Sequence, residues 1–210
     1  MKDKILAFKK IKAVKQRYAN ITNVYCSSSG TPSSCPIETQ NDIYNDVTNF
    51  SSGKIYKKNH AVKQGGYFKY ALIDKECDLA FVAANWGGIA TDNIDGVTRP
   101  SFIWKPSYQD STNFEPKVVK ISFGEGYEQR VSNGINNNLL KFDYSFEDRN
   151  QRETFSILHF LNERNSKEMF LFIPHFPYVT QKRFICRSWS ESRTFYDNFT
   201  IRAQFEEVAA

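Results

Sequence analysis

A two-residue alternation of apolar and polar side chains in the second half of the chain limits its possible folds more than any other feature. The clearest run spans 140–147, where Leu, Phe, Tyr and Phe occupy every second position and the residues between them are polar or charged. A second run, at 199–206, follows the same rule. Because successive side chains of a strand point to opposite faces, each run predicts a strand with one buried face.

Residues 118–134 combine this alternation with glycine-rich breaks. Val119, Ile121 and Phe123 alternate with polar neighbours, and Gly124 and Gly126 then interrupt the run. A polar and aromatic stretch follows before the chain breaks again at its next glycine. This pattern is typical of a half-buried antiparallel strand that ends in a turn. We therefore expect the rest of the second half to pack on it.

One helix and further strands complete the expected second domain. Asn150, with Glu153 three residues later, predicts a capping box, and an apolar stripe at helical spacing runs to about residue 165. Residues 169–173 are apolar on both faces, and another alternating run begins at about 183. Five or six antiparallel strands with one helix indicate a mainly-β sandwich or split barrel, which we assign to 102–210.

The first 100 residues are expected to form a separate N-terminal extension, a small α+β module. Its expected parts are a basic helix at 3–19, a loop at 20–52, a small β module at 53–90 and a linker at 91–101. Gly65-Gly66 predicts a hairpin turn inside the β module. Cys26 and Cys35 lie in the loop, where they could form a disulfide or remain free thiols.

The formal net charge of +5 lies entirely in this extension. Residues 1–100 hold 14 basic and 9 acidic side chains, whereas residues 101–210 hold 14 of each. A basic amphipathic segment can be a docking helix with solvated lysines, or it can bind nucleic acid through residues 2–17. No apolar run is long enough for a membrane span or a secretory signal, so we expect synthesis in a cytoplasm.

No group of residues indicates an active site. Gly124 and Gly126 lack the third glycine of a dinucleotide-binding loop, and the four cysteines form no CxxC pair. His60, His159 and His175 are isolated, which is typical of packing or surface residues. We therefore expect no enzyme activity, no metal and no cofactor.

The β module, over about 53–90, is weakly similar to small chitin- and cellulose-binding modules in the order of its glycines and aromatic residues. That similarity implies sugar binding by Tyr67, Tyr70 and Trp86, with a host-surface glycan as the partner. On this interpretation the protein would be a carbohydrate-binding adhesion protein. The alternative is that these aromatics form the core of a module too small to bury much else.

The second half, over about 102–208, resembles the lambda-type phage minor tail protein M family. The resemblance rests on an ordered set of short blocks rather than on any single one. They are Phe102-x-Trp104-Lys105, the block from Phe123 to Arg130 followed by Gly134, Ile135 and Asn136, Phe160-Leu161, the run from Phe170 to Pro174, Phe184-x-Cys186-x-x-Trp189, and Ile201-x-Ala203-x-Phe205. Glu125 stands where the family usually has Asp, which keeps the charge.

This resemblance implies a distal tail protein of a siphophage with a tail-tube type of β fold. Members assemble with themselves as a ring of six, which joins the tail-tube protein to the tail-tip hub protein and lets DNA pass through the lumen without specific binding. They are structural components of the virion, made in the host bacterial cytoplasm, and have no catalytic residues. The first 100 residues have no counterpart in the short family members.

Three residues of the glycine-rich block are candidates for the oligomer interface: Tyr127, Gln129 and Arg130. Tyr and Arg are enriched at interface hot spots. We therefore predict that these residues contact the adjacent protomer or brace the turn that does so. The alternative is a hairpin within the domain, in which Arg130 pairs with Glu125 or Glu128.

Overall fold

The computed structural model describes residues 25–26, 33–34, 47–74, 77–78, 80–108, 110–123, 126–134, 136 and 138–209. The predicted basic helix at 3–19, most of the predicted loop and the question of a Cys26–Cys35 bridge lie outside these residues. Two short strands, β1 (Tyr25–Cys26) and β2 (Ser33–Ser34), pair with each other. No helix in the described part of the chain is long and apolar enough to cross a membrane.

A five-stranded antiparallel sheet forms the body of the molecule. Its order is β10 (Ser111–Phe114), β13 (Leu140–Arg149), β16 (Asn198–Glu207), β15 (Lys182–Phe195) and β14 (Phe170–Phe172). The two alternating runs of the sequence are the neighbouring strands β13 and β16, in which Phe142 faces Phe205 and Phe146 faces Ile201. The predicted mainly-β fold with antiparallel strands is confirmed.

Helix α2 (Gln151–Arg164) packs on the apolar face of this sheet through Ile157, Phe160 and Leu161, all fully buried. Its N-cap is Asn150, whose side chain accepts a hydrogen bond from the Glu153 N–H at 2.9 Å, as the capping box predicts. The second half of that motif is absent, because the Glu153 carboxylate pairs with Arg149 instead.

Aromatic rings fill the space between the sheet and the helix. Phe102 lies at the centre of this core, with neighbouring ring centroids 5.0 to 6.0 Å away, mostly in edge-to-face or tilted arrangements. Those neighbours are Trp104, Phe146, Phe160, Phe170, Phe172 and Phe205. Such pairs add to the stability that burial of apolar area provides.

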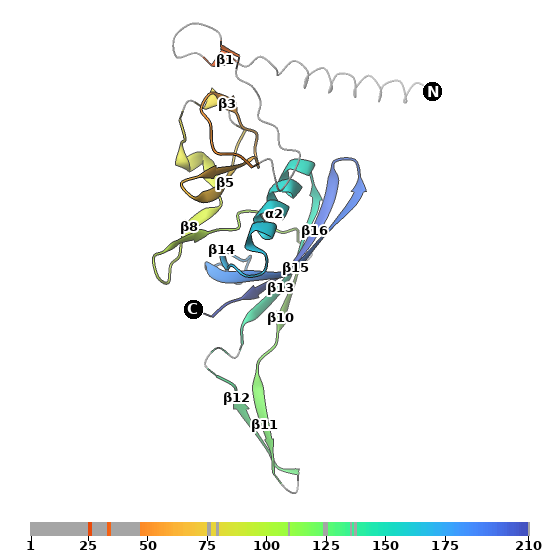
Figure 1. Cartoon of the computed structure of the whole chain (residues 1–210). Coiled ribbons are helices and arrows are strands. Elements are labelled where there is room, and N and C mark those ends of the chain that lie inside the picture. The colour runs from red at the N-terminus through yellow and green to blue at the C-terminus, as the bar shows by residue number, and fades with distance from the viewer. Residues whose placement is uncertain are drawn as a thin grey trace, which may run out of the picture.

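The N-terminal part of the described chain, 47–100, forms a small module beside α2 (Figure 1). Its strands are β3 (Lys54–Ile55), β4 (Ala61–Gln64), β5 (Tyr67–Ala71), β6 (Cys77–Asp78), β7 (Trp86–Gly87), β8 (Ile89–Thr91) and β9 (Thr98–Pro100), with a 3₁₀ turn at Ala83–Asn85. The predicted hairpin at Gly65-Gly66 joins β4 to β5, and both glycines have positive φ. Tyr56, Val62, Ala71 and Trp86 form a small core of its own.

The segment expected to be a linker, 91–101, has a different structure from that expectation. Most of it belongs to the β8–β9 hairpin, and its last residue, Ser101, bridges to Leu171 in strand β14. Ala61 and Tyr70 of the module also belong to the main core. The polar, turn-rich sequence therefore marks a tight turn rather than a flexible connection, because its acidic side chains cap backbone N–H groups within the turn.

The expectation for residues 118–123 is wrong in one respect. They do form a strand, β11 (Val118–Ser122), but among the described strands it pairs with β12 (Glu128–Ser132) alone, and all its side chains are exposed. The five-stranded sheet packs on helix α2 instead of on this strand. Alternation determines which side chains share a face, but it does not determine whether the same chain covers that face.

Candidate functional site

The β11–β12 hairpin, which we call the arm (118–132), projects away from the body at the end opposite the module (Figure 1). Its five residue pairs run from Val118↔Ser132 to Ser122↔Glu128. A two-stranded hairpin alone is at best marginally stable in water. The arm therefore has the composition and placement of an element that is completed by another surface.

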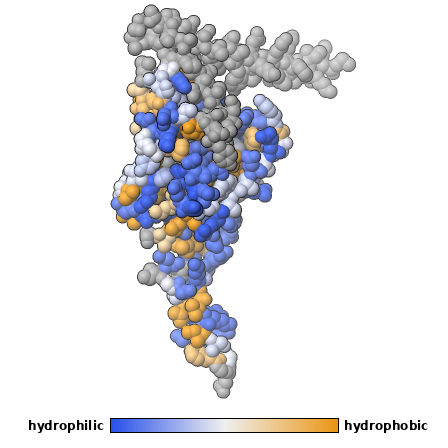
Figure 2. Space-filling model, viewed as in Figure 1, coloured by the Kyte–Doolittle hydropathy of each residue, from blue (hydrophilic) through white to orange (hydrophobic). Residues whose placement is uncertain are grey.

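One face of the arm is apolar. Directly paired residues share a face, so Val119 lies beside Val131, and Ile121 beside Gln129. Phe123 and Tyr127 extend the same row, with their ring centroids 6.0 Å apart. The apolar side chains of this face are between 42% and 70% exposed, and Tyr127 is the most exposed. Figure 2 shows the resulting hydrophobic strip along the arm.

The opposite face of the arm is charged. Lys120 pairs directly with Arg130, and both side chains approach the carboxylate of Glu128. The Arg130–Glu128 distance is 3.6 Å, and the Arg130 side chain is largely exposed. Surface ion pairs of this kind contribute at most about 1 kcal/mol. This face is adapted to water, and the apolar face is not.

The three candidate interface residues therefore do not act as one group. Tyr127 and Gln129 lie on the apolar face, whereas Arg130 lies on the charged face with the partner that the hairpin alternative predicted. Glu125, the other predicted partner, lies outside the described residues. The sequence analysis did not predict the exposure of Val119, Ile121 and Val131, because alternation indicates burial within the domain.

The candidate sugar-binding residues do not form a platform. Sugar rings stack on exposed aromatic faces, but Tyr70 is fully buried in the main core and Trp86 is only 6% exposed. Phe50, Tyr56 and Phe81 surround the Trp86 indole. Tyr67 alone of the three is accessible. The structure therefore favours the alternative, in which the aromatics are the core of a small module.

Two polar contacts join the module to helix α2 and its neighbourhood. Asn59, which has positive φ and is buried, accepts hydrogen bonds from the Ser156 hydroxyl and, at 3.3 Å, from the Trp104 indole N–H. The Tyr70 hydroxyl lies 3.0 Å from Nδ1 of His159. These bonds satisfy polar groups that would otherwise be buried without partners.

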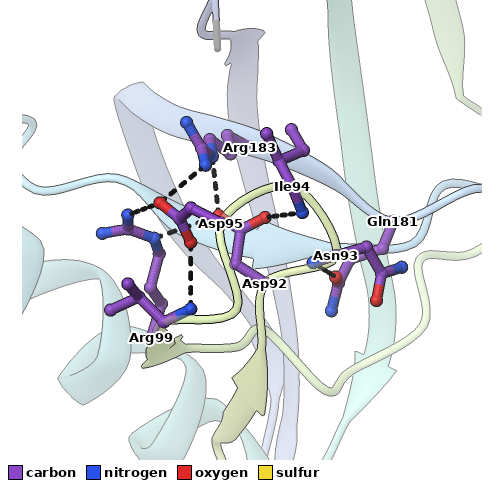
Figure 3. A network of polar contacts seen from close by, with 8 residues as sticks. Asp92, Asn93, Ile94, Asp95, Arg99, Gln181 and Arg183 are labelled. Atoms are coloured by element: carbon purple, nitrogen blue, oxygen red, sulfur yellow. Dashed lines mark hydrogen bonds and ion pairs between the residues drawn. The ribbon is translucent and has the colours of Figure 1, made fainter.

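A third contact joins the β8–β9 turn to strand β15 (Figure 3). The Asp92 carboxylate, 2% exposed, accepts hydrogen bonds from the Ile94 N–H and from the guanidiniums of Arg99 and Arg183. Asp95 binds the same two arginines. Burial acts to raise the pKa of Asp92, but these donors outweigh it, so its pKa lies below the ordinary value.

The isolated histidines are packing or surface residues, as expected. His60 and His159 are buried against aromatic rings, and His175 forms a 2.8 Å ion-pair contact with Asp110 at the surface. Burial raises the pKa of the Cys186 thiol to about 12, which makes it a poor nucleophile. Within the described residues, no cluster of three or more potential ligands could hold a metal ion.

Comparisons with known proteins identify the second half of the chain. Residues 100–209, just over half of the chain, match the phage minor tail protein family. Tail tip protein M of Escherichia phage lambda is 34% identical over 109 residues, which are 51% of this chain and 96% of that protein. Tail tip protein M of Escherichia phage N15 is 30% identical over 116 residues, 54% of this chain and 99% of that protein.

Among solved structures, a chain from the tail of an empty GTA particle with C6 symmetry is similar over 49% of this chain and 75% of its own length. The TM-score is 0.34 and the sequence identity is 13%, values too low to indicate a shared fold or role. The family match, by contrast, includes the whole five-stranded sheet, α2 and the arm. The chain therefore belongs to the phage minor tail protein family, and it is a structural component of a phage tail.

Proposed function

We propose that this chain forms a ring of six copies at the distal end of a siphophage tail, where it joins the tail-tube protein to the tail-tip hub protein. Membership of the minor tail protein family supports this role, and both curated relatives are named tail tip proteins. DNA would pass through the lumen without specific binding. The balance of 14 basic and 14 acidic side chains in residues 101–210 is compatible with a wall that does not retain DNA.

The observation that carries the proposal is the uncovered apolar face of the arm. We assign this face, with Tyr127 at its tip and Gln129 within it, to the contact between adjacent copies in the ring. A ring requires a contact between two different surfaces of identical subunits, so a projecting element that reaches a neighbour suits it. Arg130 would then remain solvated beside Glu128, since it lies on the other face.

Matched serine substitutions on the two faces test this assignment. Ile121→Ser and Tyr127→Ser remove apolar area from the proposed contact and are expected to weaken assembly, with about 2 kcal/mol for the tyrosine if it is a hot spot. Arg130→Ser changes a position of β12 on the charged face and should leave assembly unchanged. Size-exclusion chromatography with light scattering, followed by negative-stain imaging, reports the assembly state.

The measurement is made on the protein alone and again with purified tail-tube or hub protein added, because the ring could require either partner. A ring of six that is lost in Ile121→Ser and Tyr127→Ser but kept in Arg130→Ser supports the proposal. If assembly is lost only in Arg130→Ser, the contact between adjacent copies lies on the charged face of the arm instead. A chain that stays monomeric with both partners would contradict the ring itself.

A further inference from the structure

The contact between the module and helix α2 contains a buried histidine. His159 is 4% exposed, and its ring packs edge-to-face on Phe68 of the module, with the centroids 4.8 Å apart. Its Nδ1 lies 3.0 Å from the Tyr70 hydroxyl, also in the module. Phe155, on the helix, stacks parallel to the imidazole. The His159 imidazole therefore lies at the boundary between helix α2 and the module, where it contacts residues of both.

The surroundings of His159 favour its neutral form. Burial, and then the nearby Arg164 guanidinium, lower the pKa of His159 to about 4. Arg164 is itself buried, with its guanidinium 4.5 Å from the Phe160 ring centroid. In the described part of the chain, the carboxylate close to the imidazole belongs to the half-exposed Glu163, whose oxygen is 4.0 Å from Nε2, too far for a hydrogen bond.

The hydroxyl of Tyr70 fits the same charge state. Burial raises the pKa of this phenol, so it retains its proton and can donate to Nδ1. When the hydroxyl donates in this way, the imidazole proton lies on Nε2, which faces Glu163. Among the described residues, the titratable groups that face His159 are thus Tyr70 from the module, and Glu163 and Arg164 from the helix. Adding a proton would place a second cation beside Arg164 in a buried contact.

We propose that His159 is a proton-operated latch: protonation of its imidazole releases the N-terminal module from helix α2.

The direction of the pH effect follows from the difference between the docked and released states. A released module leaves the imidazole in water, where its pKa is about 6.5. Because the docked pKa is the lower one, docking is at full strength above about pH 6.5 and weakens as the pH falls towards 4. Between these limits the docking constant is expected to fall about tenfold for each pH unit.

The other contacts between the two parts respond differently to acid. The hydrogen bonds of Asn59 to Ser156 of α2 and to Trp104 involve no titratable group, so they contribute a pH-independent part of the docking free energy that protonation of His159 has to exceed. The contact of Asp92 and Asp95 with Arg183 survives until its carboxylates are protonated, and their pKa values lie below the ordinary value. The β8–β9 hairpin therefore keeps the module attached to strand β15 while the contact with α2 opens.

Hydrogen-exchange mass spectrometry on the full chain between pH 7 and pH 4 tests the latch, with rates corrected for the intrinsic effect of pH. Release withdraws Ala61 of β4 and Tyr70 of β5 from the main core and leaves these strands only the small core of the module, so their amides are expected to lose protection at a higher pH than amides of β13 and β16. In His159→Gln, which carries no titratable group there, the loss in β4 and β5 should move at least about one pH unit lower. His175→Gln, at the exposed ion pair with Asp110, is the control and should cause no shift.

A second measurement applies even if His159→Gln fails to dock at neutral pH. The chain has three histidines, so their imidazole proton signals can be followed separately by NMR in the unmodified protein. The latch requires the His159 signal to titrate together with the loss of protection in β4 and β5. A release that accompanies protonation of His60 instead, or a joint loss of protection in β5 and β16, would overturn it.

Discussion

Asp92 remains charged although almost none of its surface reaches water. Three donors make this possible: the Ile94 N–H and the guanidiniums of Arg99 and Arg183. A buried ion pair adds little net stability compared with an apolar replacement, because both ions lose their hydration. Removal of one partner is costly, however, since the remaining charge is then buried with too few donors. The network therefore makes the docking geometry specific.

This argument predicts a large difference between two arginines of strand β15. Arg183→Ala should lower the free energy of unfolding by about 2 to 4 kcal/mol, because it deprives Asp92 and Asp95 of a shared donor. Arg187→Ala, four residues away, removes an exposed partner of Glu206 and should cost less than about 1 kcal/mol. Urea unfolding followed by circular dichroism measures both. Equal losses would show that the Asp92 network contributes no more than a surface pair.

At the scale of elements, the first turn of helix α2 is stabilised both by a neighbouring residue and by a residue that is distant in the sequence. Asn150 caps the first turn through its side chain, while the Asp197 carboxylate of the β15–β16 turn accepts a hydrogen bond from the Gln151 N–H at 2.7 Å. The first of these bonds follows from neighbouring residues. The second depends on a turn 46 residues away, which no local pattern could indicate.

The cap can be tested by a pair of alanine substitutions. Asn150→Ala should destabilise the protein by about 1 kcal/mol, since the Glu153 N–H loses its acceptor. Gln151→Ala is the control, because the Asp197 bond uses the backbone of residue 151 and an exposed alanine favours the helix. Thermal unfolding of both variants separates the two effects. An Asn150→Ala midpoint equal to that of the control would mean that the helix end is held by Asp197 alone.

At the scale of the whole molecule, the described parts of the module and of the family domain share one core. Tyr70 and Ala61 of the module lie in the same core as Phe102 and Phe160 of the family domain. Three polar contacts, centred on Asn59, His159 and Asp92, close the boundary around that core. The module therefore lies beside α2 and covers the flank that carries Ser156 and His159 (Figure 1).

A truncated chain tests this dependence at the molecular scale. Residues 101–210 alone would expose Phe155, His159 and the Trp104 side of the core, so we expect low solubility or loss of cooperative unfolding. Circular dichroism and light scattering, compared with the full chain, make the measurement. A soluble fragment with the same unfolding midpoint as the full chain would show that the module adds nothing to the stability of the family domain.

Much of the fold was predictable from particular residues. The alternation at 140–147 and 199–206 predicted β13 and β16, and Asn150 with Glu153 predicted the start of α2. The ordered aromatic and glycine blocks predicted the family. Each of these signals is local, because a strand or a helix start imposes its period or its cap on adjacent residues.

The candidate site was predictable only in part. The sequence alone predicted a strand at residues 118–123 that ends in a glycine turn close to Tyr127, with a hairpin within the domain as the alternative. Only the tertiary structure decided that no other strand of the described residues pairs with this hairpin, and that Arg130 lies on the face opposite Tyr127. It also decided that Tyr70 and Trp86 are buried. The physical reason is that a side-chain period specifies which residues share a face, whereas burial depends on contacts between segments far apart in the chain.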